Sequence, residues 1–85
     1  MIRKKVRIDL DTGLEARPLA HVVQLASQYE SSIHIEVEDK SVNAKSIMGM
    51  MTMGLSKGEE ITLTASGEDE EAAITALEGY LSQAN

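Results

Sequence analysis

Apolar and polar residues alternate in four short segments of this 85-residue chain, which is the pattern of a β-strand with one buried face. The clearest case is Ile33, Ile35 and Val37, which alternate with His34 and Glu36. The other predicted strands cover residues 6–10, 41–43 and 61–65, and a turn is expected at residues 38–40.

A second pattern repeats apolar residues every three or four positions, as in an amphipathic helix. It predicts a first helix that has Pro18 in its first turn and buries Leu19, Val22, Val23, Ala26 and Tyr29. A last helix opens on the acidic run at residues 68–71, because negative side chains favour the positive end of the helix dipole. Its buried positions are Ala73, Ile74, Leu77 and Leu81. Gly79 weakens this helix, and nothing in the sequence explains it.

Ser46 is a favoured N-cap residue and predicts a short helix directly after it. Four of the five methionines fall between residues 48 and 53. The helical period turns Ile47, Met50 and Met51 toward the sheet and leaves the other two methionines of this group nearer the surface. Exposed methionines beside a serine would form an adaptable apolar docking patch.

The expected elements follow the order strand, helix, strand, strand, helix, strand, helix. Strands with a single apolar face predict an antiparallel sheet that is covered on one side. The helices must lie on that side to bury their own apolar stripes. We therefore expect an α+β fold in which three helices cover one face of a four-stranded antiparallel sheet. The length, with no linker or repeat, predicts one domain over residues 1–85.

Composition narrows the function classes. The formal net charge is −6, and two tyrosines are the only aromatic residues, which argues against direct binding of nucleic acid. No cysteine is present, so no disulfide or thiolate metal site is expected. We expect a cytoplasmic protein, because we find no signal peptide or membrane-spanning segment. Neither histidine has partners at a metal-ligand spacing, so no metal or cofactor is expected.

Two segments carry a family resemblance. Gly13-Leu14-Glu15-Ala16-Arg17-Pro18 resembles the active-site loop of HPr, the phosphocarrier of the bacterial sugar phosphotransferase system, in which a histidine stands where this chain has Glu15. Val42-Asn43-Ala44-Lys45-Ser46-Ile47-Met48-Gly49 resembles the regulatory serine region of the same family in Gram-positive bacteria. A retained serine with a missing histidine is similar to the catabolite-repression branch of the family. The resemblance implies the open-faced β-sandwich of HPr.

The same resemblance implies a regulatory protein and not an enzyme. Glu15 cannot form the phosphoramidate of a phosphocarrier, so no catalytic residue is expected. Ser46 would be phosphorylated by an ATP-dependent HPr kinase/phosphorylase, and the product would act as co-repressor of a LacI-type catabolite control repressor. The residues expected to bind partners are Arg17, Ala20, Ser46, Ile47, Met48 and Met51. Phosphate oxygens at a helix N-terminus meet free N–H groups, so the added charge need not disturb the fold.

Alternatives for this region remain open. The chain could be a working phosphocarrier that accepts a phosphoryl group from enzyme I at Glu15, as an acyl phosphate, or at His21, which the helical period exposes on the face of Arg17. Glu15 could also be a solvated acid worth about 0.3–1 kcal/mol at the helix start, or its charge could imitate a phosphohistidine. A third function is an interaction protein that binds metabolic enzymes through the same face.

Two further expectations concern the surface. Arg17, Lys40 and Lys45 lie in the motif segments and would make the functional face locally positive on an acidic body. Lys45 would then help to screen a phosphate on Ser46 or be recognised by a partner. The first strand, if it lies at the edge of the sheet, could exchange between chains and give a homodimer.

Overall fold

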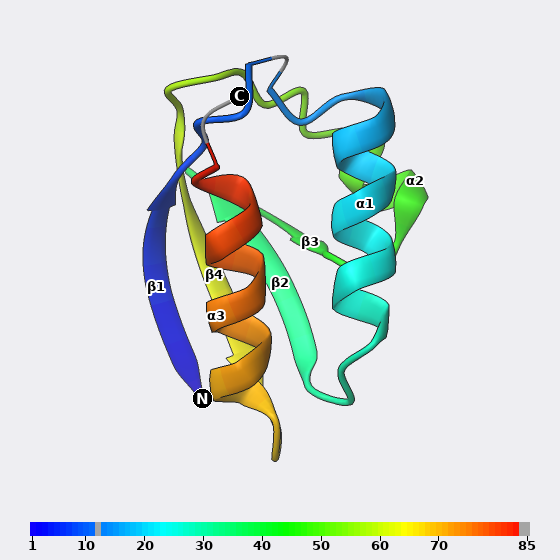
Figure 1. Ribbon diagram of the computed structural model, residues 1–85, viewed down its shortest axis with the longest axis vertical. Helices are drawn as coiled ribbons and strands as arrows, with labels where there is room; N and C mark the ends of the chain where they lie inside the picture. Colours follow the sequence, from blue (N-terminus) through cyan, green and yellow to red (C-terminus); the bar gives the residue numbers. More distant parts are fainter. Residues whose placement is uncertain (12, 84–85) are drawn as a thin grey trace.

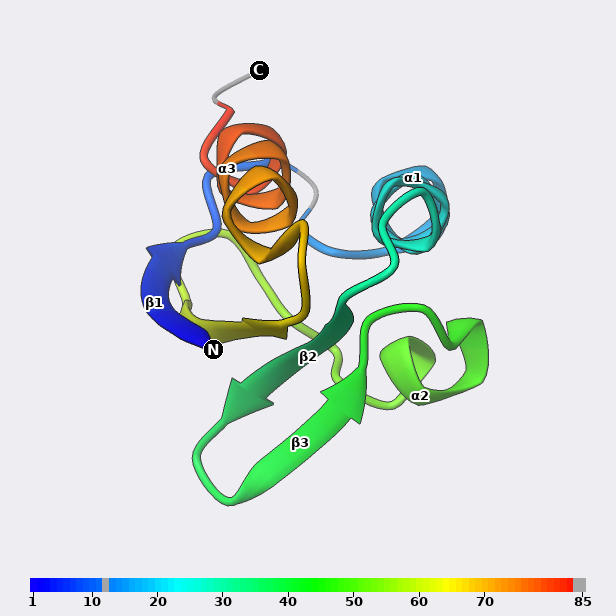
Figure 2. The same ribbon diagram turned by 90° about the horizontal axis from the view of Figure 1, so that it is seen from below.

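The computed structural model describes residues 1–11 and 13–83, with the backbone alone for Ala16. Its seven elements are β1 (Ile2–Arg7), α1 (Ala16–Ser27), β2 (Ser32–Val37), β3 (Lys40–Asn43), α2 (Ile47–Met51), β4 (Glu60–Ser66) and α3 (Glu70–Leu81). The strands form one sheet in the order β1-β4-β2-β3, and every neighbouring pair is antiparallel. The helices pack over one face of this sheet (Figures 1 and 2), so the expected α+β fold is confirmed.

Alternation along the strands builds the core as the sequence predicts. Ile33 and Ile35 of β2, with Ile61 and Leu63 of β4, are almost completely buried under α1 and α3. Thr64 is an exception, because it is 4% exposed although its position in β4 suggests the polar face. It stands between Arg3 of β1 and His34 of β2 in the strand register, so neighbouring strands cover it.

The first strand differs from its predicted bounds. Paired strand runs from Ile2 to Arg7, whereas the alternation predicted residues 6–10. Ile8 and Leu10 are still buried, but their segment leaves the ladder: the Ile8 N–H donates to Glu59 O at 2.9 Å, and the Asp9 N–H donates to Leu81 O at 2.8 Å. The basic residues 3–5 lack the alternation from which strands were predicted, so the sequence pattern did not identify the start of β1. An edge strand can nevertheless carry exposed charges at successive positions.

The prediction for α2 is wrong in part. Met50 is completely buried as expected, but Ile47 is 48% exposed and Met51 is 68% exposed. Met53, expected near the surface, is half-buried and packs against the core. A five-residue helix turns too few times to present a complete apolar stripe, so only one of its positions points fully inward.

Gly13 fixes the loop that precedes α1. Its φ is +67°, and a Cβ atom there would lie 2.6 Å from the carbonyl oxygen of Leu55. The adjoining Leu14 N–H donates to that same oxygen at 2.9 Å. Because only glycine fits this close approach in a left-handed conformation, the residue pins the loop against the segment before β4. The start of α1 is thereby held in place.

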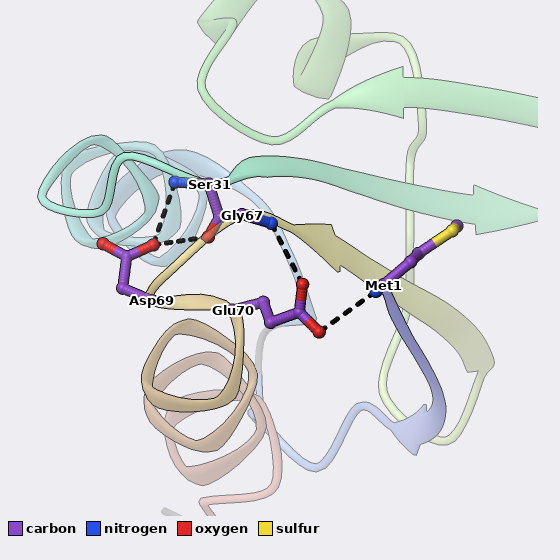
Figure 3. A network of polar contacts seen from close by, with 5 residues as sticks. All are labelled: Met1, Ser31, Gly67, Asp69 and Glu70. Atoms are coloured by element: carbon purple, nitrogen blue, oxygen red, sulfur yellow. Dashed lines mark hydrogen bonds and ion pairs between the residues drawn. The ribbon is translucent and has the colours of Figure 1, made fainter.

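A polar network joins the turn after α1 to the turn before α3 (Figure 3). The Asp69 carboxylate accepts hydrogen bonds from the N–H of Glu30 at 2.8 Å, from the N–H of Ser31 at 2.9 Å and from the Ser31 hydroxyl. The Glu70 carboxylate accepts the Gly67 N–H at 3.0 Å and lies 3.1 Å from the amino group of Met1. These acids were predicted only as partners of the helix dipole, but Asp69 also binds the turn after α1, and Glu70 also binds the adjoining Gly67 and the amino group of Met1.

Candidate functional site

Glu15 occupies the N-cap position of α1, and the sequence predicted it only near the start of this helix. Its backbone is extended, with φ −132° and ψ 157°, and its side chain forms no capping hydrogen bond. Both Glu15 and Arg17 are exposed, and Arg17 lies in the first turn of the helix. A carboxylate and a guanidinium therefore lie on the surface at the start of α1, where free backbone N–H groups give a positive end.

Ser46 occupies the N-cap of α2, which confirms that prediction. Its extended backbone has φ −104° and ψ 113°, and its Oγ accepts the N–H of Gly49 at 3.2 Å. The Ser46 N–H donates to Asn43 O at 3.0 Å, and the Met50 N–H donates to Ser46 O at 2.9 Å. Ser46 is half-buried, and its hydroxyl acts here as an acceptor. Local hydrogen bonds thus hold it at the surface end of the helix.

Three large apolar side chains of α2, the helix that this serine caps, are exposed on the surface. Ile47 is 48% exposed, Met48 is 76% exposed and Met51 is 68% exposed; we call these three residues the α2 patch. Ala20 of α1 is also exposed, and α1 and α2 pack side by side (Figure 2). The described residues contain one other large apolar side chain with comparable exposure, that of Met1. The α2 patch is therefore a concentrated apolar surface on a charged protein.

The three cations that were expected on this face are dispersed. Lys45 is half-buried, and its Nζ donates to the carbonyl oxygen of Tyr29 at 2.6 Å. Lys40 begins β3 at the β2–β3 turn, which lies away from α1 in Figure 2. Arg17 alone is exposed beside position 15. The hypothesis of a shared positive face is therefore wrong. Sequence gives no signal for the Lys45 contact, because its partner is a backbone carbonyl 16 residues away.

The two histidines have different surroundings. His21 is exposed on α1, as predicted, and its ring stacks on Tyr80 of α3 with ring centroids 4.1 Å apart. His34 lies in β2 and is half-buried. Within the described part of the chain, no three His, Asp or Glu side chains are grouped so that they could hold a metal ion. Over the same residues, no helix has the length and apolar character needed to span a bilayer.

Comparison with known proteins places this geometry in a family. The family model described as "PTS HPr component phosphorylation site" matches residues 2–83. The chain belongs to the HPr family. The matched range includes the segment from Gly13 to Pro18, in which position 15 is a glutamate.

Individual relatives agree with this assignment. The chain is 47% identical over 83 residues to the HPr-like protein Crh of Bacillus subtilis (strain 168), which covers 98% of each. A crystal structure of HPr-C-His from Thermoanaerobacter tengcongensis superposes with a TM-score of 0.92 at 48% identity, covering 95% of this chain and 91% of that one. The crystal structure of Bacillus subtilis Crh gives a TM-score of 0.79 at 46% identity, covering 100% and 98%. That structure is described as a catabolite repression protein with a swapped domain in an intertwined dimer.

Proposed function

We propose that this HPr-family chain is a regulatory protein of carbon catabolite repression. An ATP-dependent HPr kinase/phosphorylase transfers the γ-phosphoryl group of ATP to the Ser46 oxygen, and the hydroxyl proton and ADP leave. The phosphorylated chain then binds a LacI-type catabolite control repressor as its co-repressor. The chain acts as a substrate and a ligand and not as an enzyme, and it makes no direct contact with DNA.

The observation that carries this proposal is the position of Ser46 beside the α2 patch. A phosphoserine adds about −1.5 to −2 charges and three acceptor oxygens. Here those charges appear next to exposed Ile47, Met48 and Met51, so one modification adds an anionic contact to an apolar surface that is already formed. A basic side chain of the repressor would pair with the phosphate while apolar side chains cover the patch. Arg17 and Ala20, exposed on the neighbouring helix, extend the proposed binding face.

The carboxylate at position 15 supports regulation over phosphocarrier activity. The Glu15 side chain is exposed and makes no capping hydrogen bond, so its simplest role is a solvated negative charge at the positive end of α1. An acyl phosphate on this carboxylate, or a phosphoramidate on His21, would be the product of the alternative phosphocarrier.

Two incubations separate these functions. The protein is treated with phosphoenolpyruvate and enzyme I in one reaction, and with ATP and the serine kinase in the other, and each product is weighed. One acid-stable phosphate in the second reaction alone, absent in Ser46→Ala, supports the regulator. An acid-labile phosphate in the first reaction contradicts it and favours the carrier.

We further propose that the chain forms a homodimer by exchange of β1. This strand is at one edge of the sheet and pairs with β4 alone among the described strands. The Bacillus subtilis relative, described as an intertwined dimer with a swapped domain, supports exchange of a segment between two chains here. Exchange replaces an intramolecular β1–β4 ladder with the same ladder between two chains, so it requires few new contacts.

A further inference from the structure

Lys45 precedes Ser46, and its side chain reaches a residue that follows the end of α1. Its Nζ donates a 2.6 Å hydrogen bond to the carbonyl oxygen of Tyr29, and the side chain is half-buried. Tyr29 follows the C-terminal end of α1, where backbone carbonyls carry the negative end of the helix dipole. A positive side chain is therefore well placed at this site. The ammonium joins the segment that carries Ser46 to the end of the neighbouring helix.

The remaining hydrogen bonds around Ser46 are local. The Lys45 N–H donates to Asn43 Oδ1 at 2.8 Å, and the Gly49 N–H donates to Ser46 Oγ at 3.2 Å. The Ser46 N–H and Met50 N–H bonds also stay within residues 43–50. Two of them end on Asn43 of β3, which is paired with His34 of β2, so they fix the start of the segment to the edge of the sheet. Among the hydrogen bonds of the described residues, the Lys45 Nζ bond alone ties residues 45–51 to a distant part of the chain.

Helix α2 is short, and few of its own side chains are buried. A five-residue helix is far below the length at which helices are stable in isolation. Its apolar anchoring comes mainly from Met50, because Ile47, Met48 and Met51 are exposed. The Lys45 bond is the hydrogen bond that links this segment to the end of α1 among the described residues.

We propose that Lys45 is a positioning residue for the modification of Ser46, and that its bond to the Tyr29 carbonyl holds residues 45–51 in the geometry that the kinase binds. This inference rests on the proposed function, because it concerns the same serine. Without the ammonium, the segment samples other conformations and the kinase must order it on binding. That ordering weakens binding of the protein substrate and leaves the chemical step unchanged.

Kinetics with the ATP-dependent kinase test the proposal on three variants. Lys45→Met keeps the aliphatic stem and removes the donor, Lys45→Arg keeps a cationic donor, and Lys40→Met removes an equal charge at the β2–β3 turn. We expect KM for Lys45→Met to rise about tenfold with kcat within about twofold of wild type. Lys45→Arg should recover most of the loss, and Lys40→Met should match wild type. An unchanged KM for Lys45→Met overturns the inference.

Amide hydrogen exchange on the unphosphorylated protein provides a readout that does not involve the kinase. The Gly49 and Met50 amides, which bond to Ser46, should exchange about tenfold faster in Lys45→Met and return toward wild type in Lys45→Arg. A raised KM with unchanged exchange would show that the kinase contacts the Lys45 charge itself, which contradicts a positioning role. If wild-type protein takes no phosphate at Ser46, the proposed function fails, and exchange still decides whether Lys45 orders the segment.

Discussion

At the scale of single residues, the site depends on contacts that each join distant parts of the chain. Gly13 allows the loop before Glu15 to lie against Leu55, and Asp69 binds the turn after α1 through two N–H groups and a hydroxyl. The hydrogen bonds from Ser31, above all from its hydroxyl, and from the Glu30 N–H lower the pKa of Asp69, because they favour the ionised carboxylate. Such residues control stability through one specific atom.

Gly13→Ala should lower the free energy of unfolding by roughly 2–4 kcal/mol. This range combines the cost of a left-handed alanine with the overpacking of a Cβ atom 2.6 Å from the Leu55 oxygen. Gly54→Ala is the matched control, because its φ is +57° but nothing lies within 4 Å of the added Cβ atom. That control should lose only about 1–2 kcal/mol. Urea titration followed by circular dichroism measures both, and equal losses would contradict the role of the close approach.

Asp69 should make stability depend on pH on the acid side. Its pKa in the folded protein is below the usual value, so its contribution is complete above about pH 4 and is lost as pH falls through the depressed folded pKa. Thermal unfolding at pH 7 and pH 3 should show a smaller drop in Tm for Asp69→Asn than for wild type. Glu68→Gln, at an exposed neighbouring position, should keep the wild-type drop. Identical pH slopes in all three proteins would refute this linkage.

At the scale of elements, α2 and α3 differ in what stabilises them. Helix α3 has twelve residues and buries Ala73, Ile74, Leu77 and Leu81, whereas α2 has five and buries Met50. Gly79 lies on the exposed side of α3, and nothing lies within 4 Å of the place that a Cβ atom would take there. The structure therefore does not explain why this position is a glycine. It is simply a weak point in an otherwise well-anchored helix.

Gly79→Ala should raise the free energy of unfolding by about 0.5–1 kcal/mol. Alanine loses less backbone entropy than glycine in a helix, and the methyl group meets open space. Gly67→Ala provides the contrast, since its Cβ atom would lie 2.6 Å from Ser31 Oγ and should destabilise the protein. Chemical denaturation of both variants measures these effects. A loss of stability in Gly79→Ala would mean that this position has a contact which the helix alone does not explain.

At the scale of the whole molecule, two surfaces are available to partners. The α2 patch lies beside Ser46 and α1, and the free edge of β1 lies on the outer side of β4 (Figure 1). They use different chemistry, because the patch offers apolar side chains and the edge offers backbone hydrogen-bonding groups. The two can therefore be tested separately.

Removing thioethers from the patch should weaken repressor binding after phosphorylation. The double variant Met48→Ser, Met51→Ser loses two exposed apolar side chains, so its affinity for the repressor should fall about tenfold or more. Ala72→Ser, at an exposed position of α3, serves as the control. Isothermal titration of phosphorylated proteins, with mass spectrometry to confirm equal modification, gives the comparison. Wild-type affinity in the double variant would remove the patch from the proposed interface.

Exchange of β1 should give a dimer whose fraction rises with protein concentration. Light scattering after size exclusion would detect it, and isotope-filtered NMR on a mixed labelled and unlabelled sample would identify the exchanged strand. Contacts between Val6 of one chain and Ile61 of another are expected, because these residues are paired in the β1–β4 register. A monomer at millimolar concentration, or a dimer without these contacts, would contradict the exchange.

The sequence by itself determined the features that depend on local order. Period-two and period-3.6 patterns identified the strands and helices, Ser46 was recognised as an N-cap, and the two motifs indicated the family. Local preferences and one-sided burial follow from the identities of neighbouring residues, so they can be recognised from the sequence alone. The sequence alone likewise showed that position 15 is a glutamate where the resembling loop has a histidine.

The tertiary structure alone decided how these parts meet. It ended β1 at Arg7, exposed Ile47 and Met51, and turned Lys45 toward a carbonyl 16 residues away. It also directed Asp69 to a turn 38 residues distant, where the sequence showed only an acidic helix start. The physical reason is that each outcome depends on which distant backbone or side-chain group occupies the adjoining space. Periodicity along the chain carries no information about that neighbour.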